Sequence, residues 1–276
     1  MNRIKVLIVT CLVAITAIAQ NDKFLLDYKY TTTSDKETIV DYRLHTSTEK
    51  SMFYNTTSLW MDSISRSDAA CTAYGEMAAS MMSKGQGAAV PDRSANIFVC
   101  KSFSDNSMRV YDDFDDQFAF YDESLDEMRW EIGDSVKVIL DYECVLASTN
   151  YHGRTWNVWF AIDLPIHDGP WKFHGLPGLI LSAEDATGSH KFEAIGIERT
   201  DTPIPQMYRQ DWYSKEDRKL FLKSKRQYTD NPLAYILQSQ GIPPNANIKV
   251  TDLNGNEIDP NSLIDSSFDF LETDYR

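Results

Sequence analysis

The chain has 276 residues, 42% of them hydrophobic and 12% aromatic, which is enough apolar material for one large domain or two small ones. Its 41 acidic and 27 basic residues give a formal net charge of −14. Nucleic acids and anionic membrane surfaces are bound through Lys and Arg, so this acidity argues against both as partners.

Residues 1–19 have the three parts of a secretory signal peptide. Arg3 and Lys5 form a basic start, residues 6–15 an apolar stretch, and Ala17-Ile-Ala19 a small-residue cleavage site. The apolar stretch is shorter than the roughly 20 residues that a membrane-spanning helix needs. We therefore expect a periplasmic or secreted protein with no transmembrane segment after cleavage.

Strands are expected along most of the chain, because apolar and polar residues alternate with the period of a β-strand. The clearest single strand has Val136, Val138, Leu140, Tyr142, Cys144 and Leu146 on one face. Another runs from Trp156 to Leu164. Further strands are predicted at residues 24–31, 38–46, 50–55, 96–103, 107–112, 117–122, 128–132, 178–184 and 189–199. The short spacings leave no room for crossover helices, so the sheet should be antiparallel.

Helices are expected in only a few places. Residues 67–84 are rich in Ala and Met and end at Gly85. Ser214-Lys-Glu-Asp217 has the pattern of a capping box, which predicts a helix to about Tyr228, followed by a shorter one at 232–240. Residues 248–258 have the pattern of a hairpin that turns at Asn254-Gly255.

Three cysteines follow the predicted signal peptide, and an oxidising compartment permits one disulfide among them. Cys144 falls on the apolar face of its strand, which is typical of a buried thiol. The favoured pairing is therefore Cys71 with Cys100.

The segment Gly169-Pro-Trp-Lys-Phe-His-Gly-Leu-Pro-Gly178 interleaves three glycines and two prolines with large apolar side chains. Glycine admits positive φ and proline fixes φ, so the run predicts a defined turn that leads into a strand. A phosphate-binding loop is disfavoured, because Pro177 has no N–H to donate. The predicted structural turn residues are Gly169, Pro170, Gly175, Leu176, Pro177 and Gly178.

This segment, together with Gly153-Arg-Thr-Trp156 and Trp159 upstream, resembles the core signature of the GLPGLI family. The similarity is best over residues 127–197. It implies a secreted or envelope protein of Gram-negative bacteria, from a family with no assigned activity and no catalytic residue to carry over. A fold-level analogy to the envelope lipoprotein carriers adds the expectation of a hydrophobic hollow.

The predicted fold is therefore mainly β: a curved antiparallel sheet or half-barrel packed on one or two helices, in the manner of a lipoprotein carrier. Helix 67–84 is expected to be the enclosed element. Residues 20–203 would form the β-rich domain, and residues 204–276 a C-terminal helical and hairpin extension.

The predicted ligand-binding residues are Arg154, Trp156, Trp159, Trp171 and Phe173. Trp159 breaks the alternation of its strand, so it either packs under Trp171 or lines a binding surface. Trp and Arg are common in binding hot spots, although large aromatic residues more often fill cores. Arg154 would donate to loop carbonyls or meet an anionic ligand group.

Catalytic and metal-binding motifs are mostly absent, and we predict no cofactor and no metal. His167, His174 and His190 have no spacing that enforces metal geometry. The acidic run Asp112–Asp116 lacks the Gly and Glu positions of a calcium loop.

The sequence thus favours a non-enzymatic envelope module over an enzyme. Its partner would be an apolar or peptide-like ligand, or an outer-membrane protein. The alternatives left open are an uncharacterised enzyme, including one that depends on a metal at those histidines, and a structural envelope component.

Overall fold

The structure is a computed structural model that describes residues 23–33, 37–93, 95–243, 249–251, 255–258 and 269–276. The predicted signal peptide lies outside these residues. Within the described chain, no helix is both long enough and apolar enough to cross a membrane.

The main sheet contains twelve strands. They are β1 (Phe24–Thr33), β2 (Glu37–Thr46), β3 (Lys50–Tyr54), β4 (Phe98–Ser102), β5 (Ser107–Phe114), β6 (Gln117–Ser124), β7 (Glu131–Ile139), β8 (Tyr142–Tyr151), β9 (Arg154–Ala161), β10 (Leu179–Asp185), β11 (His190–Arg199) and β12 (Ser214–Lys215). Their order is β12-β6-β5-β4-β3-β2-β1-β11-β10-β9-β8-β7. Every neighbouring pair is antiparallel except β12 with β6, which is parallel.

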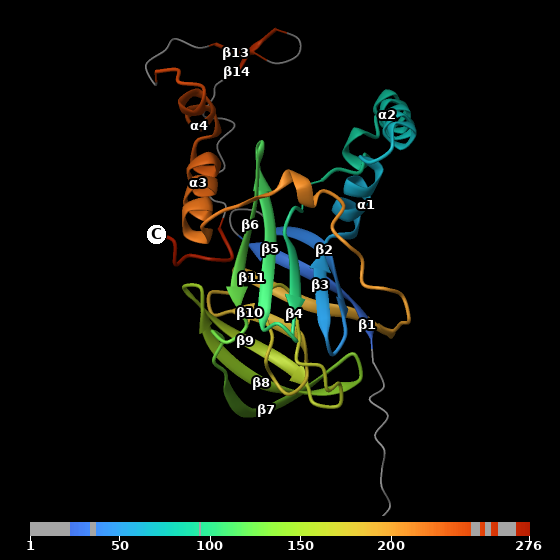
Figure 1. The fold of residues 1–276 in the computed structure, drawn as a ribbon, viewed down its shortest axis with the longest axis vertical. Helices are drawn as coiled ribbons and strands as arrows, with labels where there is room; N and C mark the ends of the chain where they lie inside the picture. Colours follow the sequence, from blue (N-terminus) through green and yellow to red (C-terminus); the bar gives the residue numbers. More distant parts are fainter. Residues whose placement is uncertain (1–22, 34–36, 94, 244–248, 252–254, 259–268) are drawn as a thin grey trace, which may run out of the picture.

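Four helices and a small hairpin complete the described chain. The helices are α1 (Thr56–Ile64), α2 (Asp68–Ser83), α3 (Arg218–Asp230) and α4 (Pro232–Ser239). The hairpin pairs β13 (Val250–Thr251) with β14 (Glu257–Ile258), as predicted. The sheet curves strongly, so the predicted mainly β fold with a curved antiparallel sheet is confirmed (Figure 1).

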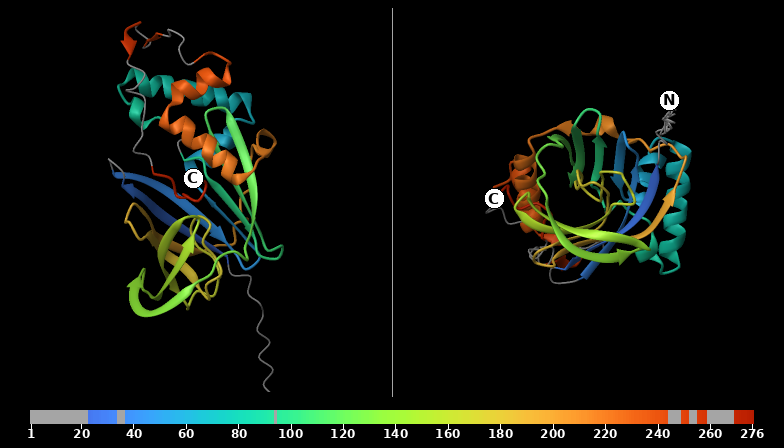
Figure 2. Two further views of the ribbon diagram at one scale, coloured as in Figure 1. Left: turned by 90° about the vertical axis from the view of Figure 1, so that its left-hand side faces the viewer. Right: turned by 90° about the horizontal axis from the view of Figure 1, so that it is seen from below.

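The main core lies on the inner face of the curve. Phe24, Leu26 and Tyr28 alternate with less buried residues along β1, as the period of a strand requires. The connection between β9 and β10, residues 162–178, runs inside the curve, where Figure 2 shows it in yellow from below. Its buried apolar side chains join the same core cluster. This connection therefore fills the hollow.

Helix 67–84 was predicted to be the enclosed element, and this prediction is wrong. Helix α2 forms over nearly the expected residues, capped by the Ser67 hydroxyl, which accepts from the N–H of Ala70, but none of its residues is buried. It projects beyond α1, whose Leu59 packs with side chains of the sheet (Figure 1). Small Ala side chains give it no continuous apolar stripe to bury. The bulkier connection 162–178 occupies the interior instead.

The predicted single strand through Val136 and Leu146 is in fact a hairpin. Leu140 and Asp141 have φ of 48° and 67°, which makes a two-residue turn between β7 and β8. The register places Lys137 opposite Cys144, and Val138 opposite Glu143. The prediction failed because apolar residues continue through the turn without the Asn-Gly signal that such turns favour.

The C-terminal region starts differently from the prediction. Ser214 and Lys215 form β12 instead of a helix cap. The cap of α3 is Asp217, three residues after Ser214, whose side chain accepts from the N–H of Leu220 at 3.0 Å. Residues Met207 and Tyr213 pack in a second cluster with apolar side chains of β3, β4 and β5. The extension after residue 203 is thus packed against the sheet.

The three described cysteines are free thiols, so the predicted Cys71–Cys100 disulfide is not formed. Cys71 lies exposed on α2, whereas Cys100 lies in β4 of the sheet, and the protrusion of α2 separates the two elements (Figure 1). Burial raises the pKa of the Cys100 thiol to about 12, so this thiol is unreactive at neutral pH. Cys144 is buried, as predicted.

Candidate functional site

A buried lysine fastens the connection 162–178 to the sheet. The ammonium of Lys101, on β4, donates to Asp168 Oδ1 at 2.6 Å and to the carbonyls of Gly169 and Phe173 at 2.9 and 2.8 Å. Both charged side chains are at most 1% exposed. Burial lowers the pKa of Lys101, and the Asp168 carboxylate opposes that shift. The lysine therefore fixes both ends of a tight loop.

The predicted Gly/Pro turn residues lie in this loop. Gly175 has a φ of 88°. A Cβ on Gly178 would lie 2.2 Å from the carbonyl oxygen of Ala161, so the backbone approach there requires glycine. The carbonyl of Pro170 accepts from the N–H of Phe173, and Leu176 is buried.

Three of the five predicted ligand-binding residues form one buried aromatic cluster. The ring centroid of Trp156 lies 5.7 Å from that of Trp171 and 4.9 Å from that of Phe173. Each of these side chains is at most 1% exposed. Trp159 lies on the other face of β9, because it is three residues from Trp156 along a regular strand. Its ring meets the ammonium of Lys137, 4.4 Å from the centroid, instead of Trp171.

Arg154 holds the end of the chain instead of the Gly/Pro loop. Its guanidinium donates to the carbonyl of Phe270 through Nε at 3.1 Å and to Asp185 Oδ2 at 2.9 Å, and it pairs with Asp269 at 2.6 Å. The sequence predicted either carbonyl contacts in the loop or an anionic ligand group for this arginine. The carbonyl of Phe270 and the carboxylate of Asp269 belong to the C-terminal segment 269–276, which we call the tail, whereas Asp185 lies on β10.

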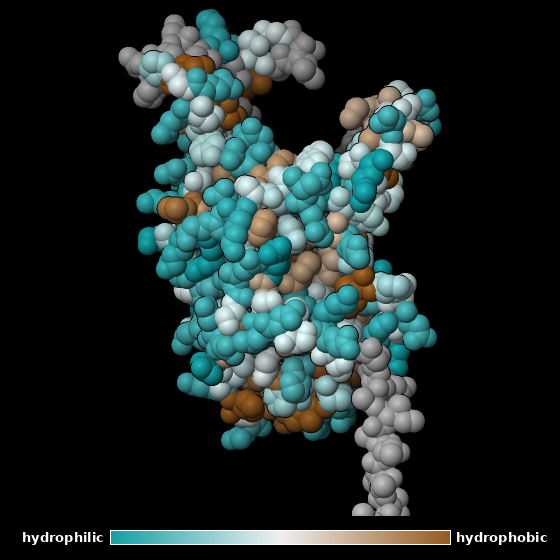
Figure 3. All heavy atoms as spheres, viewed as in Figure 1, coloured by the Kyte–Doolittle hydropathy of each residue, from teal (hydrophilic) through white to brown (hydrophobic). Residues whose placement is uncertain are grey.

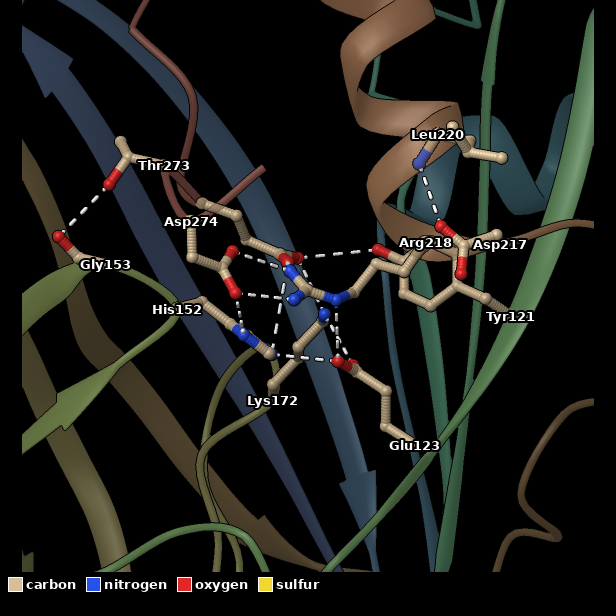
Figure 4. Close-up of polar contacts among 11 residues, drawn as sticks. Tyr121, Glu123, His152, Gly153, Lys172, Asp217, Arg218, Leu220, Thr273 and Asp274 are labelled. Carbon is tan, nitrogen blue, oxygen red and sulfur yellow. Dashed lines mark hydrogen bonds and ion pairs between the residues drawn. The ribbon is translucent and has the colours of Figure 1, made fainter. Parts of the chain in front are cut away.

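A network of ion pairs fixes the remainder of the tail (Figure 4). Glu272 pairs with Lys172 at 2.6 Å and with Arg218 of α3 at 2.5 Å. Arg218 also contacts Asp274 through two hydrogen bonds. His152 lies 3.4 Å from Asp274 and 2.8 Å from Glu123.

Lys172 itself is fully buried and also pairs with Glu123 at 2.5 Å. Burial alone would raise the pKa of Glu123, but the charges of Lys172 and His152 outweigh it and lower that pKa to about 2. We call this network, Glu123, His152, Lys172, Arg218, Glu272 and Asp274, the tail latch.

Glu123, His152 and Glu272 also have the residue types of a metal site, with possible ligand atoms within 4.8 Å of one another. The residues present do not fit a cation, because the ammonium of Lys172 and the guanidinium of Arg218 already neutralise both carboxylates. His167, His174 and His190 do not contribute to any such group among the residues that the structure describes.

The three histidines also have different surroundings. His167 is exposed, His174 contacts the carbonyls of Lys172 and Leu125, and His190 contacts the Tyr30 hydroxyl. The hypothesis of a metal site formed by these three has no support in this geometry.

A pocket of about 460 Å³ lies next to the aromatic cluster, and Trp171 belongs to both. Its walls come from β1 and β2 on one side and β5 and β6 on another, with α3 and tail residues 269–272 completing it. Trp171 is the one predicted binding residue that lines it. The apolar and aromatic lining residues are Tyr30, Ile39, Val40, Tyr42, Ala95, Ile97, Val110, Tyr121, Trp171, Leu222, Phe270 and Leu271.

Polar groups at this pocket are few and mostly paired. Asp112 Oδ1 and Oδ2 accept from the ammonium of Lys225 at 2.6 and 2.7 Å. The hydroxyl of Tyr42 makes no hydrogen bond with another described residue, and Tyr42 is 8% exposed. Burial, followed by the Asp112 charge, raises the pKa of Tyr42, so its hydroxyl keeps its proton at neutral pH.

Sequence reasoning did not find Tyr30, Tyr42, Lys225 or Phe270 as site residues. Alternation placed both tyrosines on strands, but did not show which strand faces would share a cavity with α3. Lys225 and Asp112 are 113 residues apart, and no local pattern joins them. A useful signal was the apolar pair Phe270-Leu271 in an acidic end segment, which is typical of a segment that packs.

A family match covers the segment around the turn. Residues 149–182 match a family described as "Protein of unknown function (Porph_ging)". This match agrees with the prediction of a family without assigned function, while the GLPGLI name stays a prediction. No curated protein matches the sequence.

Two structures of PNGF-II are similar in fold, with TM-scores of 0.50 and 0.51 at 13% and 14% identity. Each match covers 73% of this chain and 32% of the other, so this chain spans about a third of the PNGF-II chain. A LolA superfamily protein from Nitrosomonas europaea matches over 67% of this chain and 89% of that one, at 10% identity. Its TM-score of 0.27 is too low to support an argument about fold or function.

Proposed function

We propose that this protein is an exported, non-enzymatic binding module that holds an apolar ligand in the pocket above Trp171. The observation that carries the proposal is the pocket itself. Its volume of about 460 Å³ falls within the roughly 300–1,000 Å³ of small-molecule sites. Twelve of its described lining residues are aliphatic or aromatic, and a predominantly apolar lining is usual for such sites.

The aromatic cluster supports this role indirectly. Trp156 and Phe173 pack behind Trp171 and fix its ring, so the floor of the pocket is rigid. A preformed wall lowers the conformational entropy that binding would otherwise cost. In this proposal Trp171 contacts the ligand, Trp156 and Phe173 position it, and Arg154 holds the tail that forms one wall.

Binding of the uncharged dye N-phenyl-1-naphthylamine tests the proposal. Its fluorescence should rise saturably, with one dye bound per chain. Val40→Trp, which places a large ring in the pocket lining, should abolish the rise. Val138→Trp makes the same change on the exposed strand β7 and should bind like the native protein. Equal binding by the two variants, or no saturable binding by the native chain, would show that the pocket is not the site.

A protein partner at the sheet edge is the second candidate. Strand β7 is the last strand of the sheet, and Ile132, Val136 and Val138 on it are 53% to 69% exposed. Figure 3 shows hydrophobic surface at the lower end of the molecule, where Figure 1 places β7 and β8. An edge of this kind can accept a strand from another protein.

Retention of solubilised outer-membrane proteins on the immobilised chain tests this candidate. Val138→Lys should abolish retention, whereas Ile195→Lys, at a position 55% exposed on the interior strand β11, should not. Unchanged retention by Val138→Lys would exclude the β7 edge.

A further inference from the structure

We infer that the pocket above Trp171 selects ligands whose polar end is uncharged, and that it rejects carboxylates of the same chain length. This inference rests on the proposed function, since it specifies the ligand of the same site. The charged groups of the lining are already paired with one another or with their neighbours.

The lining offers no free cation to an anionic ligand. Lys225 is its one basic side chain among the described residues, and both oxygens of Asp112 hold the Lys225 ammonium. The Asp112 side chain is 3% exposed. A ligand carboxylate could recruit Lys225 only by leaving the buried Asp112 charge without a partner, which is strongly unfavourable.

The other charged groups around the pocket are paired in the same way. Asp113 pairs with Arg93, and Asp269 pairs with Arg154. Glu272 pairs with Lys172 and Arg218. A cationic ligand likewise has no unpaired carboxylate to meet, and it would lie close to the Lys225 ammonium. The lining therefore disfavours both signs of charge, since a charge taken out of water needs a partner.

Two polar groups of the lining lack a hydrogen-bond partner among the described residues, namely the Tyr42 hydroxyl and the buried Oδ1 of Asn96. The Tyr42 hydroxyl lines the pocket, lies close enough to Asp112 to be affected by its charge, and is available as a donor. A hydroxyl that a ligand shields from water needs a hydrogen-bond partner on that ligand. A ligand alcohol, ester or amide oxygen would supply one. The geometry thus points to a ligand with an apolar body and an uncharged oxygen acceptor.

Displacement of bound N-phenyl-1-naphthylamine by three decyl compounds tests this at about pH 7.5, where carboxylates and alkylamines are charged. Decan-1-ol should displace the dye at least about tenfold more effectively than decanoate or decylammonium, at concentrations below micelle formation. Tyr42→Phe should weaken displacement by decan-1-ol by about threefold to tenfold, after correction for the dye affinity of the same variant.

Asp112→Asn provides a gain of function. The amide keeps an oxygen for the N–H of Asp113 but releases Lys225, so this variant should bind decanoate at least about tenfold better than the native chain. The double variant Asp112→Asn/Lys225→Met should bind decan-1-ol and reject decanoate again. Unfolding temperatures identify any variant that fails to fold.

Three outcomes distinguish this inference from the proposed function. No dye binding by the native chain would refute the pocket as a site. Dye binding with equal displacement by decan-1-ol and decanoate would leave the site standing and overturn its selectivity. A native preference for decan-1-ol that Asp112→Asn does not change would show that the Asp112–Lys225 pair is not its cause.

Discussion

Arg218 and Asp274 are joined by two hydrogen bonds, from Nη1 to Oδ1 at 2.8 Å and from Nη2 to Oδ2 at 2.5 Å. Arg218 is the first residue of α3, and Asp274 belongs to the tail. Both segments form walls of the pocket, so this contact links two walls that are far apart in sequence. A planar guanidinium suits such a two-point contact with a carboxylate.

Arg218→Ala should therefore loosen the tail and lower the free energy of unfolding by about 2 kcal/mol. This is less than the roughly 3–5 kcal/mol expected for a fully buried pair, because the guanidinium is partly exposed. Hydrogen exchange of residues 269–276 should accelerate. Arg109→Ala, which breaks the exposed pair with Asp122, should cost about 0–1 kcal/mol and leave tail exchange unchanged. Equal exchange in the two variants would contradict a fastening role for Arg218.

Acid should weaken the tail latch. The folded pKa of Glu123 is lowered to about 2, and that of Asp274 is lowered as well, mainly by Arg218 acting against burial. A carboxylate whose pKa is lower in the folded chain binds protons more readily after unfolding. It therefore contributes its full stabilisation of the fold only above its unfolded pKa, about 4.3 for Glu. Stability should fall as the pH drops from about 5 towards 2, measured by urea unfolding. A free energy of unfolding that stays constant over that range would contradict it.

Lys101→Met should destabilise the protein by about 3–5 kcal/mol, since it leaves the buried Asp168 carboxylate without its partner. Lys215→Met is the matched control, because Lys215 is 67% exposed and its pair with Asp122 should be worth about 0–1 kcal/mol. Thermal and urea unfolding measure both. If Lys101→Met costs no more than Lys215→Met, Lys101 does not fix the connection 162–178.

Gly178→Ala should prevent native packing, because the new Cβ would lie 2.2 Å from the Ala161 carbonyl oxygen, a backbone atom with little freedom to move. Gly196→Ala is the control, since no atom lies within 4 Å of its Cβ position, and it should change stability by about 0.5 kcal/mol or less. Circular dichroism and melting temperature report the difference. Two variants of equal stability would mean that the turn can relax.

The strands were largely predictable, because alternation depends on a single chain segment. Predictions at 38–46, 107–112 and 178–184 fall within one or two residues of the observed starts. The hairpin at Leu140-Asp141 was not predictable, since Leu140 does not favour positive φ and no Gly follows Asp141 in the turn. Helix α1 was missed because Asn55 was read as the end of a strand instead of a helix cap.

The candidate site was predictable only in part. Trp156, Trp171 and Phe173 lie within one short stretch of sequence, and the Gly/Pro turn brings them together. Tyr42, Lys225 and the tail converge on the pocket from three separate parts of the chain. Their proximity depends on the curvature of the sheet and the path of α3, and a sequence pattern contains neither.

The position of β1 also has a consequence for folding kinetics. Strands β1 to β6 follow one another in the sheet as they do along the chain, and so do β7 to β11. Phe24 pairs with Arg199, which joins these two arrays. During synthesis β1 can therefore pair with β2 early, but its pairing with β11 requires some 170 further residues to be made. Such non-local closure is slow, so the seam between the arrays is expected to form last and to be the step at which a chaperone would help.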